Sequence, residues 1–305
     1  MTTTAQEIAL SVRAERRSVV GDAVAAMLGY LRRNPAMIIG LCFLMALVLF
    51  VVIGNLTVDT AKARPLSART LLAPSWQYPF GTDKQGRNLY AVMVAGTPLT
   101  FMIGLVAGLF GVTLGSILAF VAAYYGGVLD TLIKGVVDIG LTIPGLMILI
   151  IAGMNVHGGI QISQMMLIVA ALAWLYPART IRSQVLTLRN RAFVQVAQLS
   201  GMSGPKIIMR EMFPNLLPYL VASLVVSVSA AILASIGLEV LGLGPFESPT
   251  LGMTLYWVNY YAAIVNGWWW WWVAPIVVIA MLFTGLFLVA VGMDEFANPR
   301  IRRSI

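Results

Sequence analysis

Three charged residues, Asp130, Lys134 and Asp138, are spaced four apart in a stretch that is otherwise mostly apolar. On a helix they share one face, where opposite charges can pair. A charge at the centre of a bilayer costs about 2.5–3.5 kcal/mol on insertion scales, so we expect this set near a membrane surface. We interpret it as a structural clamp. The alternative is a proton or ion relay, but no chain of Asp, Glu and His crosses the apolar segments.

Signatures of catalysis or metal binding are missing from the sequence. It contains one cysteine, Cys42, and one histidine, His157, which excludes a thiol zinc site and any site built from several histidines. It contains no G-x-x-x-x-G-K-S/T loop for nucleotide phosphates, no nucleophile elbow and no H-E-x-x-H. We therefore predict a chain that is not an enzyme and that holds no metal or cofactor of its own.

Two series of small residues repeat at the helical offsets 0, 4, 7 and 11. They are Gly104, Gly108, Gly111 and Gly115 in one segment, and Ser223, Ser227, Ala230 and Ala234 in another. Each series falls on one stripe of a helix, and small residues let helix backbones approach closely within lipid. We interpret the stripes as packing inside one bundle. A subunit interface or a transport pathway is the alternative.

The basic segment 179–214 has a pattern of its own. We expect a helix that ends near Gly201, a Ser-Gly turn, and a short helix that starts at Pro205, where the missing N–H costs nothing. Pro214 is expected to end this short helix. A rigid helix pair that projects from a membrane domain suits a groove in a partner protein.

The uncharged intervals predict six membrane-spanning helices, since a bilayer core needs about 20 apolar helical residues. We place them at 36–54, 98–123, 131–153, 163–178, 215–238 and 272–292. Pro144 predicts a kink in the third. The tryptophan run 268–272, at the outer end of the sixth, is typical of an aromatic belt at the membrane surface. A surface that docks a protein or stacks against substrate is the alternative.

Composition and charge agree with a polytopic membrane protein. Of 305 residues, 59% are apolar and 10% charged, whereas soluble chains average about 25% charged. Soluble enzymes, disordered proteins and nucleic-acid-binding domains are thereby excluded. Of the 20 Lys and Arg residues, all but five lie in segments that share a side with the N-terminus. The positive-inside rule therefore predicts that both termini are cytoplasmic, an N-in/C-in topology.

Segment 179–214 resembles the "EAA" coupling loop in permease subunits of ATP-binding-cassette importers. The usual pattern is Glu-Ala-Ala, three residues, Gly, nine residues, then Ile-x-Leu-Pro. Here it falls on Gln195-Val196-Ala197, Gly201 and Glu211-Met212-Phe213-Pro214. The spacing, the glycine and the proline are kept. Gln195, Val196, Glu211 and Phe213 depart from the usual residues.

Further segments extend the resemblance to nearly the whole chain and narrow it to C-type subunits of the peptide/nickel permease group. They are 32–37 before the first helix, 78–87 in the outer loop, 126–130, Asp138 with Pro144, 234–244, and 298–300. Each segment is a weak signal alone. In this order and at these positions they are specific together.

The resemblance implies an all-α fold of the type I importer permease class and import of peptides across the bacterial cytoplasmic (inner) membrane. It implies four kinds of partner besides the lipid bilayer, and no nucleic acid. They are a B-type permease in a heterodimer, two ATPase subunits that bind ATP and Mg, and an extracytoplasmic substrate-binding protein. Oligosaccharides or nickel chelates are alternative cargoes for the same machinery. A stand-alone secondary transporter is the alternative from another class.

The resemblance also assigns roles along the chain. The ATPase-coupling residues are Phe193, Gln195, Val196, Ala197, Gly201, Met202, Ser203, Pro205, Lys206 and Pro214. The expected organisation is a cytoplasmic segment 1–35 that an interfacial helix would suit, the first span 36–54, an extracytoplasmic loop 55–97, a permease core 98–299 with five spans and the coupling loop, and a cytoplasmic tail 300–305.

Overall fold

The computed structural model describes residues 34–156 and 159–297, and within them it is helical with one isolated bridge between Thr82 and Asn88. The predictions for segment 1–33, for His157 and for the tail 300–305 lie outside the described residues. In chain order the elements are α2 Pro35–Thr57, η1 Thr60–Ala63, α3 Leu89–Tyr125, α4 Gly127–Thr142, α5 Gly145–Met154, α6 Ile162–Ala173, α7 Leu175–Arg189, α8 Ala192–Leu199, α9 Gly204–Ile207, η2 Ile208–Met212, α10 Phe213–Val240, α11 Leu251–Tyr260 and α12 Trp269–Ala297.

Within residues 34–156 and 159–297, five helical stretches are long and apolar enough to cross a membrane, and a sixth crossing exists if the bent pair α4–α5 counts as one. They are Pro35–Thr57, Leu89–Tyr125, Ile162–Arg189, Gly204–Val240 and Trp269–Met293. The prediction of an all-α chain with six crossings is confirmed in this form. The third crossing differs from the expected kinked helix, because α4 and α5 meet at 82°. Pro144 stands at the break as the N-cap of α5, where its fixed φ and missing N–H interrupt the helix.

The fourth crossing extends well beyond the predicted end at residue 178. Arg179 and Arg182 suggested a helix end at the membrane surface, but α7 continues to Arg189. Ala178, Ile181 and Val185 are buried on one face of α7, so this helix has an apolar side even where its other side is charged.

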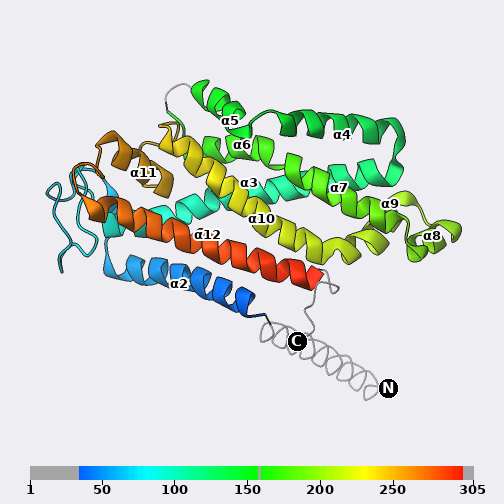
Figure 1. The fold of residues 1–305 in the computed structure, drawn as a ribbon, viewed down its shortest axis with the longest axis horizontal. Helices are drawn as coiled ribbons and strands as arrows, with labels where there is room; N and C mark the ends of the chain where they lie inside the picture. The colour runs from blue at the N-terminus through cyan, green and yellow to red at the C-terminus, as the bar shows by residue number, and fades with distance from the viewer. Residues whose placement is uncertain (1–33, 157–158, 298–305) are drawn as a thin grey trace, which may run out of the picture.

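α3 is the central helix of the bundle and packs against α10, α7 and α6 (Figure 1). Its first half contributes Ala91, Val92 and Met93 to a core shared with α10 and α12. Its last half contributes Phe120 and Ala123 to a second core shared with α7, α8 and η2. The helix therefore connects the two ends of the bundle.

α2 lies along α12 at the edge of the bundle (Figure 1). The two backbones touch at glycines: a Cβ on Gly40 would stand 2.8 Å from the Gly285 carbonyl oxygen and from the Val289 nitrogen. Gly292 faces Met37 in the same way. This pair is therefore closely packed along its length.

The ends of the bundle differ in what they carry. The start of α2, the end of α12 and the segment α8–α9 lie at one end, and the 59–88 loop with α11 lies at the other (Figure 1). The predicted coupling segment thus shares an end with the first and last described residues.

Candidate functional site

The segment 192–212 folds into two short helices joined by a tight turn. α8 ends in a turn that closes with hydrogen bonds from the Gly201 N–H to the Gln198 carbonyl oxygen, 3.0 Å, and from the Met202 N–H to the Ala197 carbonyl oxygen, 3.1 Å. This is the Schellman arrangement, which needs a left-handed residue after the helix. Gly201 supplies it with φ +74°. The kept glycine of the motif thus has a conformational reason.

One face of this segment is anchored and the other is free. Val194, Ala197, Ile207 and Met212 are buried against α3 and α7. The remaining predicted coupling residues lie on the outside, with Met202 half-buried between the two faces. The exposed ones are Phe193, Gln195, Val196, Gly201, Ser203, Pro205, Lys206 and Pro214. Val196 and Leu199 are 60% and 88% exposed, so the free face is apolar as well as basic.

Pro214 does not end the short helix, contrary to the expectation. η2 has π-helical spacing, and the Phe213 N–H bonds the Ile208 carbonyl oxygen five residues back. The extra residue in this turn accommodates a proline that lacks an N–H and would clash in regular α-helical spacing. The backbone therefore runs without a break from Gly204 to Val240.

The glycine stripe of α3 lies inside the bundle. A Cβ on Gly108 would stand 2.8 Å from the Val228 nitrogen and Cα, and one on Gly111 would stand 2.5 Å from the Ala173 carbonyl oxygen. Gly104 faces Ile232 and Val228, and Gly115 faces Trp174, Pro177 and Ala178. α10, α6 and α7 thus approach α3 at distances that a larger residue would prevent.

The small residues of α10 have different surroundings. Ser227, Ala230 and Ala234 line a groove of about 410 Å³ between α10, the α4–α5 break and the α6–α7 region. Ser223 is half-buried one turn earlier and is not among the described residues that line it. Most of this stripe therefore lines a groove.

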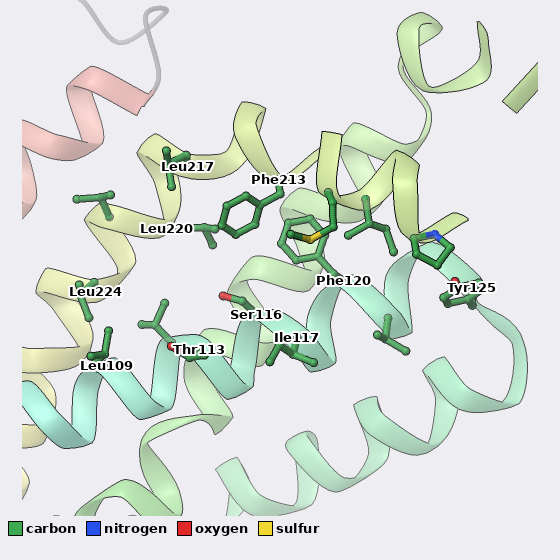
Figure 2. Close-up of a pocket in the computed structure, with 16 residues that line it drawn as sticks. Leu109, Thr113, Ser116, Ile117, Phe120, Tyr125, Phe213, Leu217, Leu220 and Leu224 are labelled. Atoms are coloured by element: carbon green, nitrogen blue, oxygen red, sulfur yellow. The ribbon is translucent and has the colours of Figure 1, made fainter. Parts of the chain in front are cut away.

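A larger groove of about 580 Å³ separates α3 from η2 and the first half of α10. Phe120 and Phe213 are in contact at this groove, with ring centroids 6.2 Å apart, and Figure 2 shows Leu220 and Leu224 further along. Thr113 and Ser116 are among its few polar residues. η2 forms one wall of this groove.

The charged set of α4 is arranged differently from the expected intrahelical pairing. Asp130 accepts two hydrogen bonds from Arg182 of α7, at 2.6 Å from Nε and 2.5 Å from Nη2. Lys134 forms no ion pair with Asp130 or Asp138 in the described part of the chain. The clamp thus joins two helices, and the 52-residue separation of its partners hid it from an argument on spacing.

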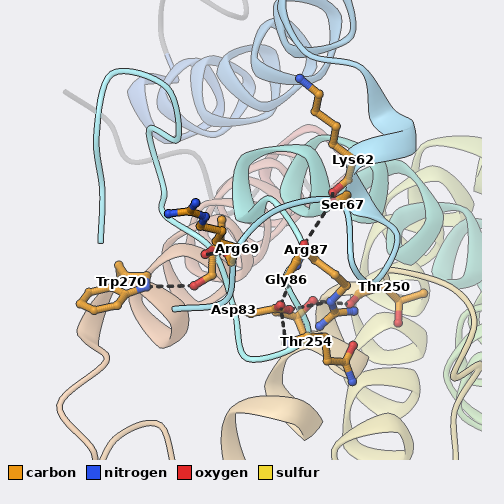
Figure 3. A network of polar contacts seen from close by, with 11 residues as sticks. Lys62, Ser67, Arg69, Asp83, Gly86, Arg87, Thr250, Thr254 and Trp270 are labelled. Carbon is orange, nitrogen blue, oxygen red and sulfur yellow. Dashed lines mark hydrogen bonds and ion pairs between the residues drawn. The ribbon is translucent and has the colours of Figure 1, made fainter. Parts of the chain in front are cut away.

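At the other end of the bundle the 59–88 loop is folded around a buried ion pair, which the sequence argument did not single out. Asp83 accepts from Arg87 Nε at 2.6 Å and from the N–H groups of Gln85 and Arg87 at 2.9 Å each. Figure 3 shows this pair beside Thr250. Both side chains are almost fully buried. The signal was present as an Asp and an Arg four apart, with Gly81 before the pair and Gly86 between its two members.

The tryptophan run packs against the 59–88 loop and α11. Trp271 is fully buried against Leu89 and Val258, while Trp269 is 55% exposed. Trp270 donates to the Thr82 carbonyl oxygen at 3.2 Å. The run thus fastens the start of α12 to the loop.

Comparison with known proteins agrees with the resemblance. The family described as "Binding-protein-dependent transport system inner membrane component" matches residues 111–303. The "Dipeptide transport system permease protein DppC" of Bacillus subtilis is 26% identical over 273 residues, which is 90% of this chain and 84% of that protein. The protein of the same name from Alkalihalophilus pseudofirmus is 29% identical over 70% of each chain. The "Oligopeptide transport system permease protein OppC" of Mycobacterium bovis is 28% identical over 57% of this chain and 60% of that protein.

The family match covers more than half of the chain, including α7, the 192–212 segment, α10 and α12. The relatives are permease proteins and not ATPases. The chain therefore belongs to the binding-protein-dependent transport system inner membrane components, as a multi-pass permease subunit of the cytoplasmic membrane that has no ATPase role of its own.

Proposed function

We propose that the chain is the C-type permease subunit of a peptide importer. It would pair with a B-type permease, two ATPase subunits that bind ATP and Mg, and an extracytoplasmic substrate-binding protein. The peptide cargo is supported by the names of the relatives, which are dipeptide and oligopeptide permeases. Oligosaccharides and nickel chelates are the competing cargoes, and uptake of each by the assembled complex separates them.

The free face of α8 and α9 is the observation that carries the proposal. Exposed apolar side chains such as Val196 and Leu199 occur in the same segment as the exposed cations Arg191 and Lys206. An exposed apolar patch on a rigid projection marks a protein interaction site. A stand-alone transporter has no use for such a surface, so copurification with two ATPase copies separates the two functions.

The same segment would transmit the motion of the ATPases. Because the backbone is continuous from Gly204 to Val240, a displacement at α9 tilts α10 and changes both grooves that α10 borders. The 59–88 loop and α11 lie at the opposite end of the helix bundle, and we assign that end to the extracytoplasmic side. Segments 1–35 and 300–305 are then cytoplasmic.

The coupling role predicts that Gly201→Asp separates ATP hydrolysis from uptake. Asp tolerates the left-handed conformation better than most residues, and nothing lies within 4 Å of the added Cβ. The fold is therefore kept while a carboxylate enters the docking face. Peptide uptake by reconstituted complex should fall about tenfold, equivalent to about 1.4 kcal/mol of lost docking, while basal ATP hydrolysis continues.

Gly127→Asp is the matched control. Gly127 also has a positive φ, +64°, and open space around it, but it is the first residue of α4 and lies outside the coupling segment. Its variant should import peptides as the wild type does. Full uptake by the Gly201 variant, or equal losses in both variants, would refute the coupling role.

A further inference from the structure

Glu239 is a fully buried acid in the last turn of α10. Its Oε2 accepts from the Thr250 hydroxyl at 2.6 Å and from the Met253 N–H at 3.0 Å. Its Oε1 accepts from the Ser235 hydroxyl at 3.1 Å. Glu239 on α10 is thus tied to the first turn of α11, and we refer to Glu239, Ser235, Thr250 and Met253 as the outer latch.

Two glycines shape the socket of the carboxylate. A Cβ on Gly244 would stand 2.8 Å from the Glu239 Cγ, and a Cβ on Gly252 would stand 2.8 Å from the Glu239 Cβ. Any larger residue at either position would displace the side chain. The backbone before α11 and in its first turn is therefore fitted to this one glutamate.

The latch joins α10 to the rest of the outer layer. The Leu251 N–H at the start of α11 donates to the Thr100 hydroxyl of α3 at 3.0 Å. Further along α11, Val258 packs against Trp271 of α12. A movement of α11 would therefore also displace its contacts with α3 and α12.

Packing α10 against α11 does not by itself require a buried carboxylate. A buried carboxylate is unfavourable unless its acceptors are satisfied, and an apolar residue would fill the same volume more cheaply. What the hydrogen bonds add is direction, because they fix the orientation of α11 relative to α10. This fixed orientation occurs at one end of a helix whose other end is the coupling segment.

We propose that Glu239 is a positioning residue that makes α10 and α11 move as one body, so that displacement of α9 and η2 reaches the outer end of the permease. The inference rests on the coupling role proposed above. Beyond that role, it names the contact through which α10 would displace α11, namely the hydrogen bonds of Glu239 with Thr250 and Met253.

The test compares three variants in the complete complex with its ATPases and binding protein. Glu239→Leu keeps most of the volume but removes both acceptors. Glu239→Gln keeps one carbonyl oxygen for Thr250 and Met253, and its amide can donate to the Ser235 hydroxyl. Glu247→Leu is the matched control, because Glu247 is exposed in the same loop region.

The first measurement is the number of peptides imported per ATP hydrolysed. We expect this ratio to fall about fivefold or more in the Leu variant, which is within the range of coupling between two sites. In the Gln and Glu247 variants the ratio should stay near the wild-type value. A merely structural role lowers the amount of assembled complex but leaves this ratio unchanged, and an unchanged ratio would overturn the proposal.

The second measurement follows α11 directly. Spin labels replace Leu56 at the end of α2 and Tyr260 in α11, both exposed, in a Cys42→Ser background. Trapping the ATPases with vanadate should change the label distance in the wild type and the Gln variant and leave it unchanged in the Leu variant. A wild type without a change, or a Leu variant that changes equally, would overturn the proposal.

Two further comparisons keep the result interpretable. If the Leu variant does not assemble, Thr250→Val removes one donor and Thr250→Ser restores it, and only the Val variant should lose coupling. If the Gly201→Asp complex remains fully coupled, the coupling role itself has failed. Failure of the outer latch alone leaves the Gly201 effect intact and makes Glu239→Leu indistinguishable from the wild type.

Discussion

The substitution Gly108→Ala tests the close packing of α3 against α10. In α3 the added Cβ would stand 2.8 Å from the Val228 nitrogen, Cα and Cγ2, about 0.6 Å short of the 3.4 Å at which ordinary contact begins. Two of these three atoms belong to the backbone of α10, so no rotamer change relieves the clash. α3 and α10 must separate along their contact.

The expected cost follows from this geometry. Overpacking of a core by one methyl group costs about 1–3 kcal/mol. Against it stands the gain from replacing glycine by alanine within a helix, about 0.5–1 kcal/mol. We therefore expect Gly108→Ala to be destabilising by up to about 2 kcal/mol, with the backbone clash outweighing the propensity gain.

Gly135→Ala isolates the propensity gain. Gly135 lies within α4 and has nothing within 4 Å of the added Cβ, so this variant should be stabilised by about 0.5–1 kcal/mol. Thermal unfolding of the purified complex in detergent compares the two variants, and their melting temperatures should move in opposite directions. A Gly108 variant as stable as the wild type, or a Gly135 variant that loses as much, would refute the packing argument.

Two ion pairs give further predictions. The first is measured by a double-mutant cycle of Asp130→Ala and Arg182→Ala in unfolding experiments. The coupling free energy should be about 1–3 kcal/mol, because the pair is bidentate and partly buried. A coupling near zero would contradict a clamp between α4 and α7. In the outer loop, Asp83→Ala should cost about 3–5 kcal/mol, because it leaves the buried Arg87 guanidinium without its partner. Arg87→Met should cost less, since Asp83 keeps two backbone N–H donors, and limited proteolysis of the loop should show the same order.

Local signals predicted the helices well, whereas contacts between distant segments were out of reach. Absent charges located all six crossings, and Pro144 located the break in the third. The size of the bend and the continuation past Pro214 depend on how neighbouring turns relax around a proline, which the residue type does not specify. The sequence argument likewise found the glycine of the turn after α8, since Gly201 is required by local backbone conformation.

Partners far apart in sequence explain what was missed at the site. Asp130 has an oppositely charged residue four positions away and yet pairs with Arg182 on another helix. Glu239 received no role from the sequence argument, and it is buried because residues 250–253 fold back over it. For both residues, the partners on another element come close only through the packing of the helices.

The pairing of α2 with α12 has a consequence for biogenesis. α2 leaves the ribosome well before α12, which is its main neighbour in the bundle. Until α12 follows, α2 has to remain in the bilayer without that neighbour. Its mean hydropathy of 3.1 favours this, and little of its surface is covered even in the finished bundle. Insertion of α12 then completes the packing around α2, so chains truncated before α12 should leave α2 without its main neighbour and open to degradation.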